Sequence, residues 1–287
     1  MRFKKSTIPY LFLLPALALI LLFKVVPILS TLVEGFTYNG SVSLRTYELL
    51  FTDSAFWKSL LTTLKFNLVI TPVQIVIAIL LALLVNVKLK GVGAIRTIFY
   101  LPVTLSMTVA TVLWNMMLNP NNGIANSILS ALGIAKQGFF TDTNQALWCI
   151  VLIASWIGVG YWMMFVLAGL KNVDESIYEA AEIDGTNWLQ KTWKVTLPMI
   201  KGSILFVLVA DTTTNFLLFA PMQLITKGGP QGSTNVLMYE AYRSAFSYAD
   251  RPRSSAIVTI LLVIIVTICI AQFRLMNAGR EKGGTVR

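Results

Sequence analysis

Six apolar runs divide this chain, and each of them is long enough to cross a lipid bilayer. They cover residues 10–33, 60–87, 94–118, 145–170, 198–224 and 254–273. A membrane-spanning helix needs about 20 apolar residues, because the hydrocarbon core is about 30 Å thick and a helix rises about 1.5 Å per residue. Since 56% of the residues are hydrophobic and only 13% are charged, too little polar surface remains to cover a soluble globule. We predict an all-α, polytopic membrane protein in which residues 1–287 form one domain with six transmembrane helices.

The basic residues predict how these helices are oriented in the membrane. The chain has a formal net charge of +10, but its Lys and Arg residues form short clusters beside the apolar runs, which argues against nucleic acid as a partner. With the N-terminus inside, the cytoplasmic segments hold 14 Lys and Arg residues and the opposite segments hold 7, as the positive-inside rule requires. Both termini are therefore predicted to be cytoplasmic. Lys24 and Lys65 fall within spans, where a snorkelling or structural role is expected.

The sequence offers little support for catalysis or metal binding. It contains no histidine, and its two cysteines, Cys149 and Cys269, lie inside apolar runs, so neither a disulfide framework nor a metal site is indicated. It also lacks the phosphate loop pattern Gly-x-x-x-x-Gly-Lys-Ser/Thr. We predict that this chain is not an enzyme and has no catalytic residue, no metal and no cofactor.

A charged cytoplasmic segment, residues 172–197, separates the fourth and fifth apolar runs. Asn172 and Asn187 are each expected to cap the start of a short helix, and Gly185 is expected to end the first one, where positive φ costs a glycine little. Pro198 then closes the second helix and opens the fifth span. The segment is predicted to be a helix, a glycine elbow and a second helix. Such a loop offers a surface that a soluble partner can bind.

The first of these two helices carries a small-residue motif. Its face contains two alanines, which allow another backbone to approach closely. Glu-Ala-Ala alone is more often part of an ordinary amphipathic loop, but Asp-Gly and Leu-Pro follow at fixed offsets. The whole pattern resembles the EAA loop of permease subunits in ATP-binding-cassette (ABC) importers. It consists of Glu179, Ala180, Ala181, Asp184, Gly185, Leu197 and Pro198.

The resemblance extends over nearly the whole chain. Further motifs look like the maltose-permease branch of carbohydrate importers, namely Phe12-Leu-Leu-Pro15, Leu101-Pro102, Trp114 with Asn119 to Asn126, Tyr178 and Thr226-Lys-Gly-Gly-Pro230. Two departures stand out: Gly202 lies where the family often has proline, and residues 249–255 lack the usual glycine- and alanine-rich start of the last span.

This resemblance implies the fold and the partners of the chain. The fold is that of a type I ABC importer permease in the bacterial inner (plasma) membrane. The expected partners are a second homologous permease, two ATPase subunits that bind ATP and Mg, and an extracytoplasmic solute-binding protein that delivers sugar. The segment 172–197 is then the coupling loop that binds an ATPase.

The resemblance also implies a substrate pathway along the fourth and fifth spans. Each span contributes four positions at i, i+3, i+4 and i+7, which form one stripe on a helix. Aromatic faces, hydroxyls and a carboxylate on such stripes suit sugars. In an alternative interpretation, Tyr161 anchors the helix at the membrane interface and Gly158 permits close helix crossing. The implied pathway residues are Ala154, Ile157, Gly158, Tyr161, Asp211, Thr214, Asn215 and Leu218.

The leading function is therefore half of the translocation pathway of an ATP-driven carbohydrate importer. A neutral sugar or oligosaccharide is favoured, because Asp211 would repel an anion. Glycerol phosphate or acidic sugars are the alternative, since Arg243, Arg251 and Arg253 are expected near the outer mouth. An ion-coupled secondary transporter would need more acids within its spans, where Asp211 is alone. A membrane enzyme would need a catalytic cluster at the membrane edge.

Overall fold

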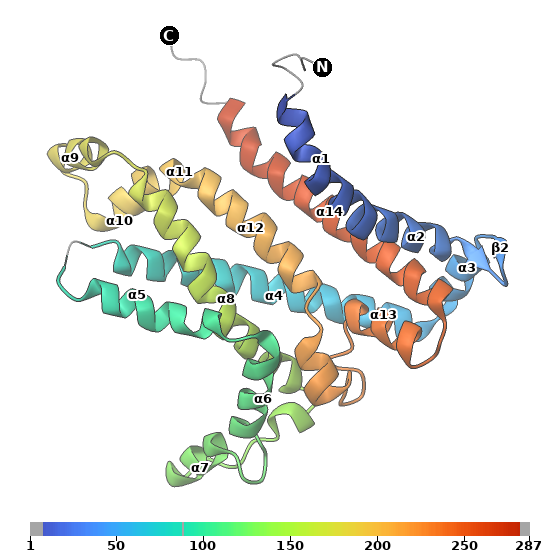
Figure 1. Cartoon of the computed structure of the whole chain (residues 1–287). Helices are drawn as coiled ribbons and strands as arrows, with labels where there is room; N and C mark the ends of the chain where they lie inside the picture. Colours follow the sequence, from blue (N-terminus) through green and yellow to red (C-terminus); the bar gives the residue numbers. More distant parts are fainter. Residues whose placement is uncertain (1–7, 88, 282–287) are drawn as a thin grey trace. The chain divides into compact units, whose positions relative to one another are not determined.

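The computed structural model describes residues 8–87 and 89–281, and it describes side chains for residues 12–87 and 89–276. Two short strands, β1 (Thr37–Tyr38) and β2 (Ser41–Val42), pair antiparallel. Single turns of 3₁₀ helix lie at Leu101–Thr104 and Phe139–Thr141, and π-helical turns lie at Leu21–Val25, Thr192–Thr196 and Met222–Thr226. The α-helices (Figure 1) are α1 (Ile8–Ile20), α2 (Val26–Gly35), α3 (Arg45–Thr52), α4 (Ser54–Val85), α5 (Val92–Tyr100), α6 (Met107–Met117), α7 (Ile124–Ala131), α8 (Ala146–Lys171), α9 (Glu175–Ile183), α10 (Trp188–Lys191), α11 (Leu197–Met199), α12 (Lys201–Phe216), α13 (Leu237–Phe246) and α14 (Arg251–Glu281).

Four helical segments of the described chain are long and apolar enough to cross a membrane: Phe12–Gly35, Ser54–Val85, Ala146–Lys171 and Arg251–Met276. Two further pairs of helices pass the same test together but are bent, by 97° between α5 and α6 and by 71° between α11 and α12. The described part of the chain thus has four candidate spans, or six if each bent pair is one span. Several cations on which the predicted orientation depends have side chains outside the described residues, namely Arg2, Lys4, Lys5, Lys88, Arg280, Lys282 and Arg287.

The third predicted span, 94–118, is not one helix. Pro102 has no N–H to continue the α-helical ladder, and the chain becomes extended at Leu105 and Ser106. The Ser106 side chain then accepts a hydrogen bond from Val109 N at 3.2 Å and caps a new helix. Local backbone chemistry therefore divides this apolar run into α5 and α6.

The fifth predicted span, 198–224, also departs from a single helix. Its backbone bends at Ile200, between α11 and α12. The helix α12 then ends at Phe216, where Leu217 N bonds to Thr213 O at 3.3 Å. Consequently Leu218 lies beyond the end of α12.

The contacts of the chain divide it into two compact units: residues 1–57 with 240–262, and residues 58–239 with 263–287. The prediction of one domain over the whole chain stays a prediction. In the first unit, α2 lies close to the start of α14 at Gly35. A methyl group added at Gly35 would lie 3.1 Å from Ala256 N, and Ser255 Oγ donates to Glu34 Oε2 at 3.1 Å.

The second unit has its core where α8 packs against α4 and α12. Buried side chains from all three helices form one cluster, which includes Ala78, Met163 and Val207. Glycines permit the close approach: a methyl group at Gly160 would lie 2.1 Å from Phe99 O of α5, and one at Gly169 would lie 2.3 Å from Ser203 Oγ of α12. Small residues at helix contacts are typical of membrane proteins, where packing replaces the hydrophobic effect as the force between helices.

Candidate functional site

The segment after α8 forms a helix, an elbow and a second helix, as predicted, but Pro198 does not close the second helix: it lies within α11, and the backbone bends at Ile200. The first helix, α9, begins two residues later than predicted: Asp174, not Asn172, is its N-cap. Asn172 still has helical backbone angles and ends α8, whereas Asp174 is extended and accepts a hydrogen bond from Ser176 N at 3.0 Å. This backbone hydrogen bond, together with one from the Ser176 side chain, lowers the pKa of Asp174 below its ordinary value.

The elbow at Gly185 is confirmed in its local structure. Gly185 has a φ of +72°, the left-handed conformation that glycine adopts at least cost. Gly185 N bonds to Glu182 O at 3.0 Å, and Thr186 N bonds to Ala181 O at 3.1 Å. This pair of bonds defines a Schellman motif, which satisfies carbonyls at the end of α9.

The second helix, α10, has the predicted cap. Gln190 N donates to Asn187 Oδ1 at 2.8 Å, and Asn187 N donates to Gln190 Oε1 at 3.2 Å, which together form a capping box. An ion pair of 2.6 Å between Lys191 Nζ and Glu182 Oε1 links α10 back to α9. The two short helices are therefore held together by local contacts.

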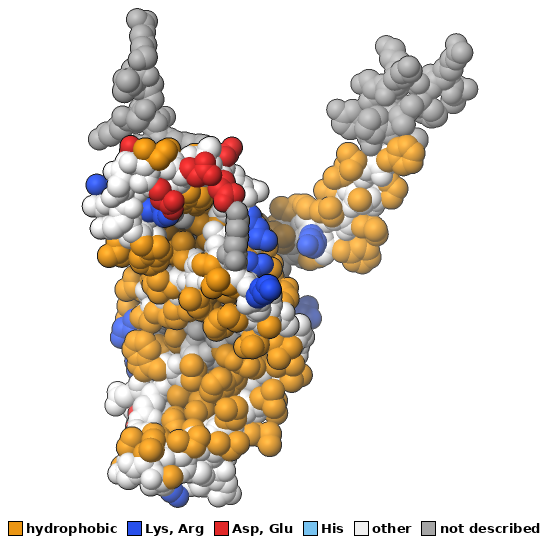
Figure 2. All heavy atoms as spheres, turned by 90° about the vertical axis from the view of Figure 1, so that its left-hand side faces the viewer, with side chains coloured by type: hydrophobic (Ala, Val, Ile, Leu, Met, Phe, Trp, Pro, Cys, Tyr) orange, Lys and Arg blue, Asp and Glu red, His pale blue; other side chains and the backbone are white. Residues whose placement is uncertain are grey.

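The motif residues of this coupling loop differ in their exposure. Glu179, Ala180, Asp184, Gly185 and Pro198 are exposed, and Leu197 is half-buried, but the side chain of Ala181 is buried. Ala181 therefore supports the elbow and does not contribute to an outer surface. Acidic side chains gather at this end of the molecule, above a mostly hydrophobic face (Figure 2).

Sequence reasoning missed four exposed apolar side chains in the same loop. Ile183 is 87% exposed and Trp193 is 69% exposed, and such solvent-facing apolar groups beside charges mark interaction surfaces. Their signal in the sequence was the unusual density of tryptophan within a charged segment. The four residues are Ile183, Trp188, Leu189 and Trp193.

The predicted pathway residues are only partly brought together. Asp211, on α12, is 1% exposed, and neither of its carboxylate oxygens has a hydrogen-bond partner among the described residues. The side chains of Trp162, Thr71 and Asn215 stand next to this carboxylate, in a geometry that gives no hydrogen bond. Asp211 also forms no ion pair with any of the described residues. An isolated carboxylate of this kind is costly within a span.

Asn215 connects α12 to α4 one turn further on. Its Nδ2 donates to Gln74 Oε1 at 3.0 Å and to Thr71 Oγ1 at 3.2 Å. Gln74 also lies against the backbone of α8, where a methyl group at Gly158 would be 2.8 Å from Gln74 Nε2. Gly158, Asp211 and Asn215 therefore meet around polar side chains of α4, and we call Thr71, Gln74, Trp162, Asp211 and Asn215 the polar cluster.

The other predicted pathway residues do not join the polar cluster as one continuous stripe. Ala154 is buried, Ile157 is half-buried, and Tyr161 and Thr214 are exposed. Leu218 is buried beyond the end of α12, so its predicted place on the same helical stripe is wrong. Tyr161 packs edge-on against Trp162, with ring centroids 4.8 Å apart.

The α4 members of the polar cluster were not predicted. They belong to a series of buried polar residues that recur every three or four positions in an apolar run, which places them on one helix face. This periodicity is visible in the sequence and indicates a helix contact or a wet cavity. The series is Ser59, Thr63, Asn67, Thr71 and Gln74.

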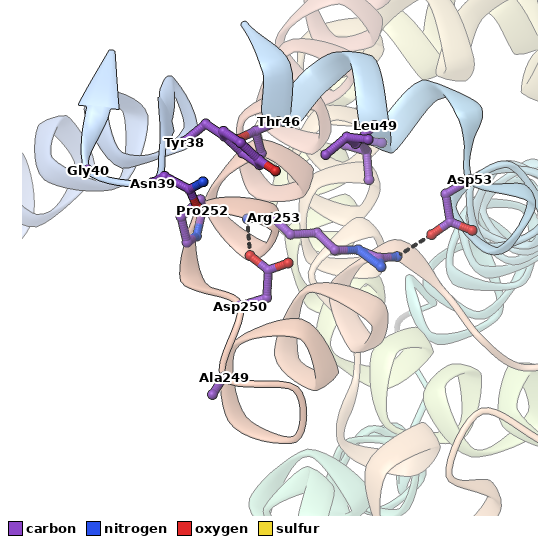
Figure 3. A pocket seen from close by; sticks show the side chains of 11 residues that line it. Tyr38, Asn39, Gly40, Thr46, Leu49, Asp53, Ala249, Asp250, Pro252 and Arg253 are labelled. Atoms are coloured by element: carbon purple, nitrogen blue, oxygen red, sulfur yellow. Dashed lines mark hydrogen bonds and ion pairs between the residues drawn. The ribbon is translucent and has the colours of Figure 1, made fainter. Parts of the chain in front are cut away.

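Two of the arginines expected near the outer mouth are engaged within the first unit. Arg253 Nη2 lies 2.8 Å from both Asp53 Oδ2 and Glu240 Oε1, on the wall of a pocket of about 570 Å³ between α3 and the start of α14 (Figure 3). Arg243 lies 3.9 Å from Glu240 and bonds to Tyr248. These guanidinium groups hold the unit together, so the expectation that they attract a substrate is not supported.

Apolar helices of spanning length, joined by an exposed helix-elbow-helix loop with the EAA pattern, define a polytopic membrane protein of the transport class. The chain belongs to the family of binding-protein-dependent transport system inner membrane components, whose model matches residues 74–279. It is 35% identical over 283 residues to the lactose transport system permease protein LacF of Rhizobium radiobacter, covering 95% of this chain and 94% of LacF. It is 30% identical over 283 residues to the sn-glycerol-3-phosphate transport system permease protein UgpA of Yersinia enterocolitica, covering 96% of each chain.

The fold agrees with a solved structure. A chain of the bacterial alginate ABC transporter, crystallised in complex with alginate pentasaccharide-bound periplasmic protein, superposes with a TM-score of 0.86 at 24% identity, covering 96% of this chain and 95% of that one. The family match confirms the predicted family, and the superposition confirms the all-helical, multi-pass fold. This chain is the permease of a binding-protein-dependent ABC importer of the carbohydrate-uptake family. As such it is a transport subunit of the inner membrane, it is not catalytic, and it has no cofactor of its own.

Proposed function

We propose that this chain forms half of the translocation pathway of an ATP-driven importer for a neutral sugar or oligosaccharide. A second homologous permease forms the other half, two ATPase subunits bind ATP and Mg in the cytoplasm, and the binding protein delivers the sugar from outside. Both termini and the coupling loop are then cytoplasmic. The observation that carries the substrate class is the isolated carboxylate of Asp211 within the polar cluster.

The coupling loop supplies the contact with an ATPase in this proposal. The exposed side chains of Glu179, Ala180 and Asp184 lie on α9 and at its end, beside the exposed Ile183 and Trp188. Apolar groups ringed by charges provide both packing and orientation when they bind a groove. Leu197 and Pro198 connect this loop directly to α12 and so to Asp211.

The charge of the polar cluster supports a neutral substrate. A carboxylate that has no cationic neighbour among the described residues repels anions and accepts hydrogen bonds from sugar hydroxyls. Asn215 and Thr214 supply further polar atoms one turn away. Glycerol phosphate remains the second candidate, because the similarity to UgpA covers nearly the whole chain.

Reconstitution of the complete importer tests this proposal. The chain should co-purify with a second permease and an ATPase, and the binding protein encoded beside it should be screened by thermal shift against lactose, maltose, neutral oligosaccharides and glycerol 3-phosphate. We expect a neutral sugar both to stabilise the binding protein and to stimulate ATP hydrolysis by the reconstituted complex. Stabilisation and stimulation by glycerol 3-phosphate alone would overturn the neutral-sugar assignment, and transport without an ATPase would overturn the coupling scheme.

A further inference from the structure

Lys65 lies at the edge of the longest charge-free stretch of α4. The 20 residues that follow it, 66–85, contain no charged side chain, and at about 1.5 Å per residue they match the thickness of a hydrocarbon core of about 30 Å. Trp148, in the first turn of α8, is 57% exposed, and exposed tryptophans gather at the boundary between hydrocarbon and headgroups. We therefore expect Lys65 to lie at the depth of lipid headgroups.

Two cavities meet at Lys65. The first, of about 420 Å³, lies between α4 and the start of α8; apolar side chains such as Phe66 and Trp148 form most of its wall, and its polar groups besides Lys65 are Thr62, Thr143, Asn144 and Ser233. The second, of about 410 Å³, lies between α4, α12 and α14, and most of its wall is apolar, including Leu64, Pro72 and Phe216. Lys65 lines both cavities. One amphipathic molecule can therefore place a polar end in the first cavity and a chain in the second.

The electrostatics around Lys65 favour an anion. The residues lining the two cavities include no Asp or Glu, and Lys65 forms no ion pair with any residue that the structure describes. The Ser233 hydroxyl is buried in the wall of the first cavity without a hydrogen-bond partner among the described residues. An unpaired ammonium and an unsatisfied hydroxyl at headgroup depth suit the oxygens of a phosphate.

We infer that Lys65 binds the phosphate of an anionic phospholipid, one acyl chain of which lies in the apolar cavity between α4, α12 and α14. Leu64 and Phe216 contact the chain, and the polar groups of Asn144 and Ser233 receive the headgroup. This site does not depend on which sugar is transported. It places a lipid against α4 and α12, the two helices that carry most of the polar cluster.

The complete importer complex, purified in detergent, provides the test. Its thermal stability is measured while phosphatidylglycerol or phosphatidylcholine is added, and we expect phosphatidylglycerol to raise the melting temperature more. Lys65→Met keeps the apolar stem but removes the charge, so it should weaken the phosphatidylglycerol response about five-fold, as expected for one interfacial cation. Lys65→Arg should retain the response. Lys58→Met is the matched control, because Lys58 is also exposed on α4 but lines neither cavity.

A second variant tests the apolar cavity, and a soluble phosphate tests the source of the anion. Leu64→Trp fills the apolar cavity without touching the charge, and it should reduce the amount of phosphatidylglycerol that co-purifies, as measured by mass spectrometry. An equal response to both lipids in the wild type, or an unchanged response in Lys65→Met, would overturn the site. A response to glycerol 3-phosphate equal to that of phosphatidylglycerol would show a soluble phosphate site and no lipid site.

Discussion

Replacement of Gly185 tests whether the elbow orients the coupling loop. Gly185 has a φ of +72°, and a methyl group built there meets nothing within 4 Å. A substitution therefore acts through the backbone conformation alone and not through a clash. A non-glycine residue in the left-handed region costs roughly 1–2 kcal/mol, and a β-branched residue is the least tolerated there. This cost changes the ratio of correctly folded to misfolded elbows by a factor of about 5–30.

The expected result for Gly185→Val is a complex whose membrane helices fold normally but whose ATPase is poorly bound or poorly stimulated. Gly185→Asn should recover most of the activity, because asparagine tolerates the left-handed region better than valine. Gly202→Val is the matched control: Gly202 also faces open space, but its φ is not positive. Co-purification of the ATPase and substrate-stimulated ATP hydrolysis measure the effect. Wild-type stimulation in Gly185→Val, or equal loss in the valine and asparagine variants, would refute the reasoning.

Three further variants test contacts in other parts of the chain. Gly160→Ala should lower the melting temperature of the purified complex, since its methyl group would lie 2.1 Å from Phe99 O, a backbone atom that cannot rotate away; an unchanged value would mean that α5 and α8 separate freely. Arg253→Met should also lower the melting temperature, because Asp53 and Glu240 each lose an ion pair of 2.8 Å, but it should leave the substrate affinity of the importer unchanged. Asp211→Asn keeps the shape and removes an unpaired charge, so transport should fall several-fold while thermal stability holds; normal transport with lower stability would show a structural role.

Local chemistry explains what the sequence predicts well in the coupling loop. The conformation of Gly185 and the capping box of Asn187 with Gln190 depend on residues within four positions of one another, so the pattern contains all of the information. The N-cap of α9 shows the limit of such patterns. Asn172 and Asp174 are both good capping residues, and the choice between them follows from where α8 ends, which is set by its packing and not by the cap itself.

Long-range contacts explain what the sequence does not predict. The hydrogen bond from Asn215 to Gln74 joins residues 141 positions apart, and the engagement of Arg253 by Asp53 joins segments at opposite ends of the chain. The 97° bend between α5 and α6 is a different case, because it follows from the local chemistry of Pro102 and the Ser106 cap, which hydropathy alone does not register. The buried polar residues of α4 recur at a regular spacing that can be read in the sequence. Their partners on α8 and α12 cannot, because they depend on how the three helices pack.

The coupling loop and the polar cluster share the same two helices, which gives the proposed coupling a physical route. The loop connects α8 to α11 and, after a bend of 71°, to α12, and α8 and α12 are in close contact at Gly169, where a methyl group would lie 2.3 Å from Ser203 Oγ. We expect a displacement of α9 to move α8 and α12 together, because the two helices are in close contact at this end. The polar cluster lies further along the same pair, at Gly158 and Asp211, where both helices contact α4. We expect a displacement of this pair against α4 to break the bond from Asn215 to Gln74 and to expose the carboxylate; under the proposed function, the loop would then change access to Asp211 without any change in the packing of α8 on α12.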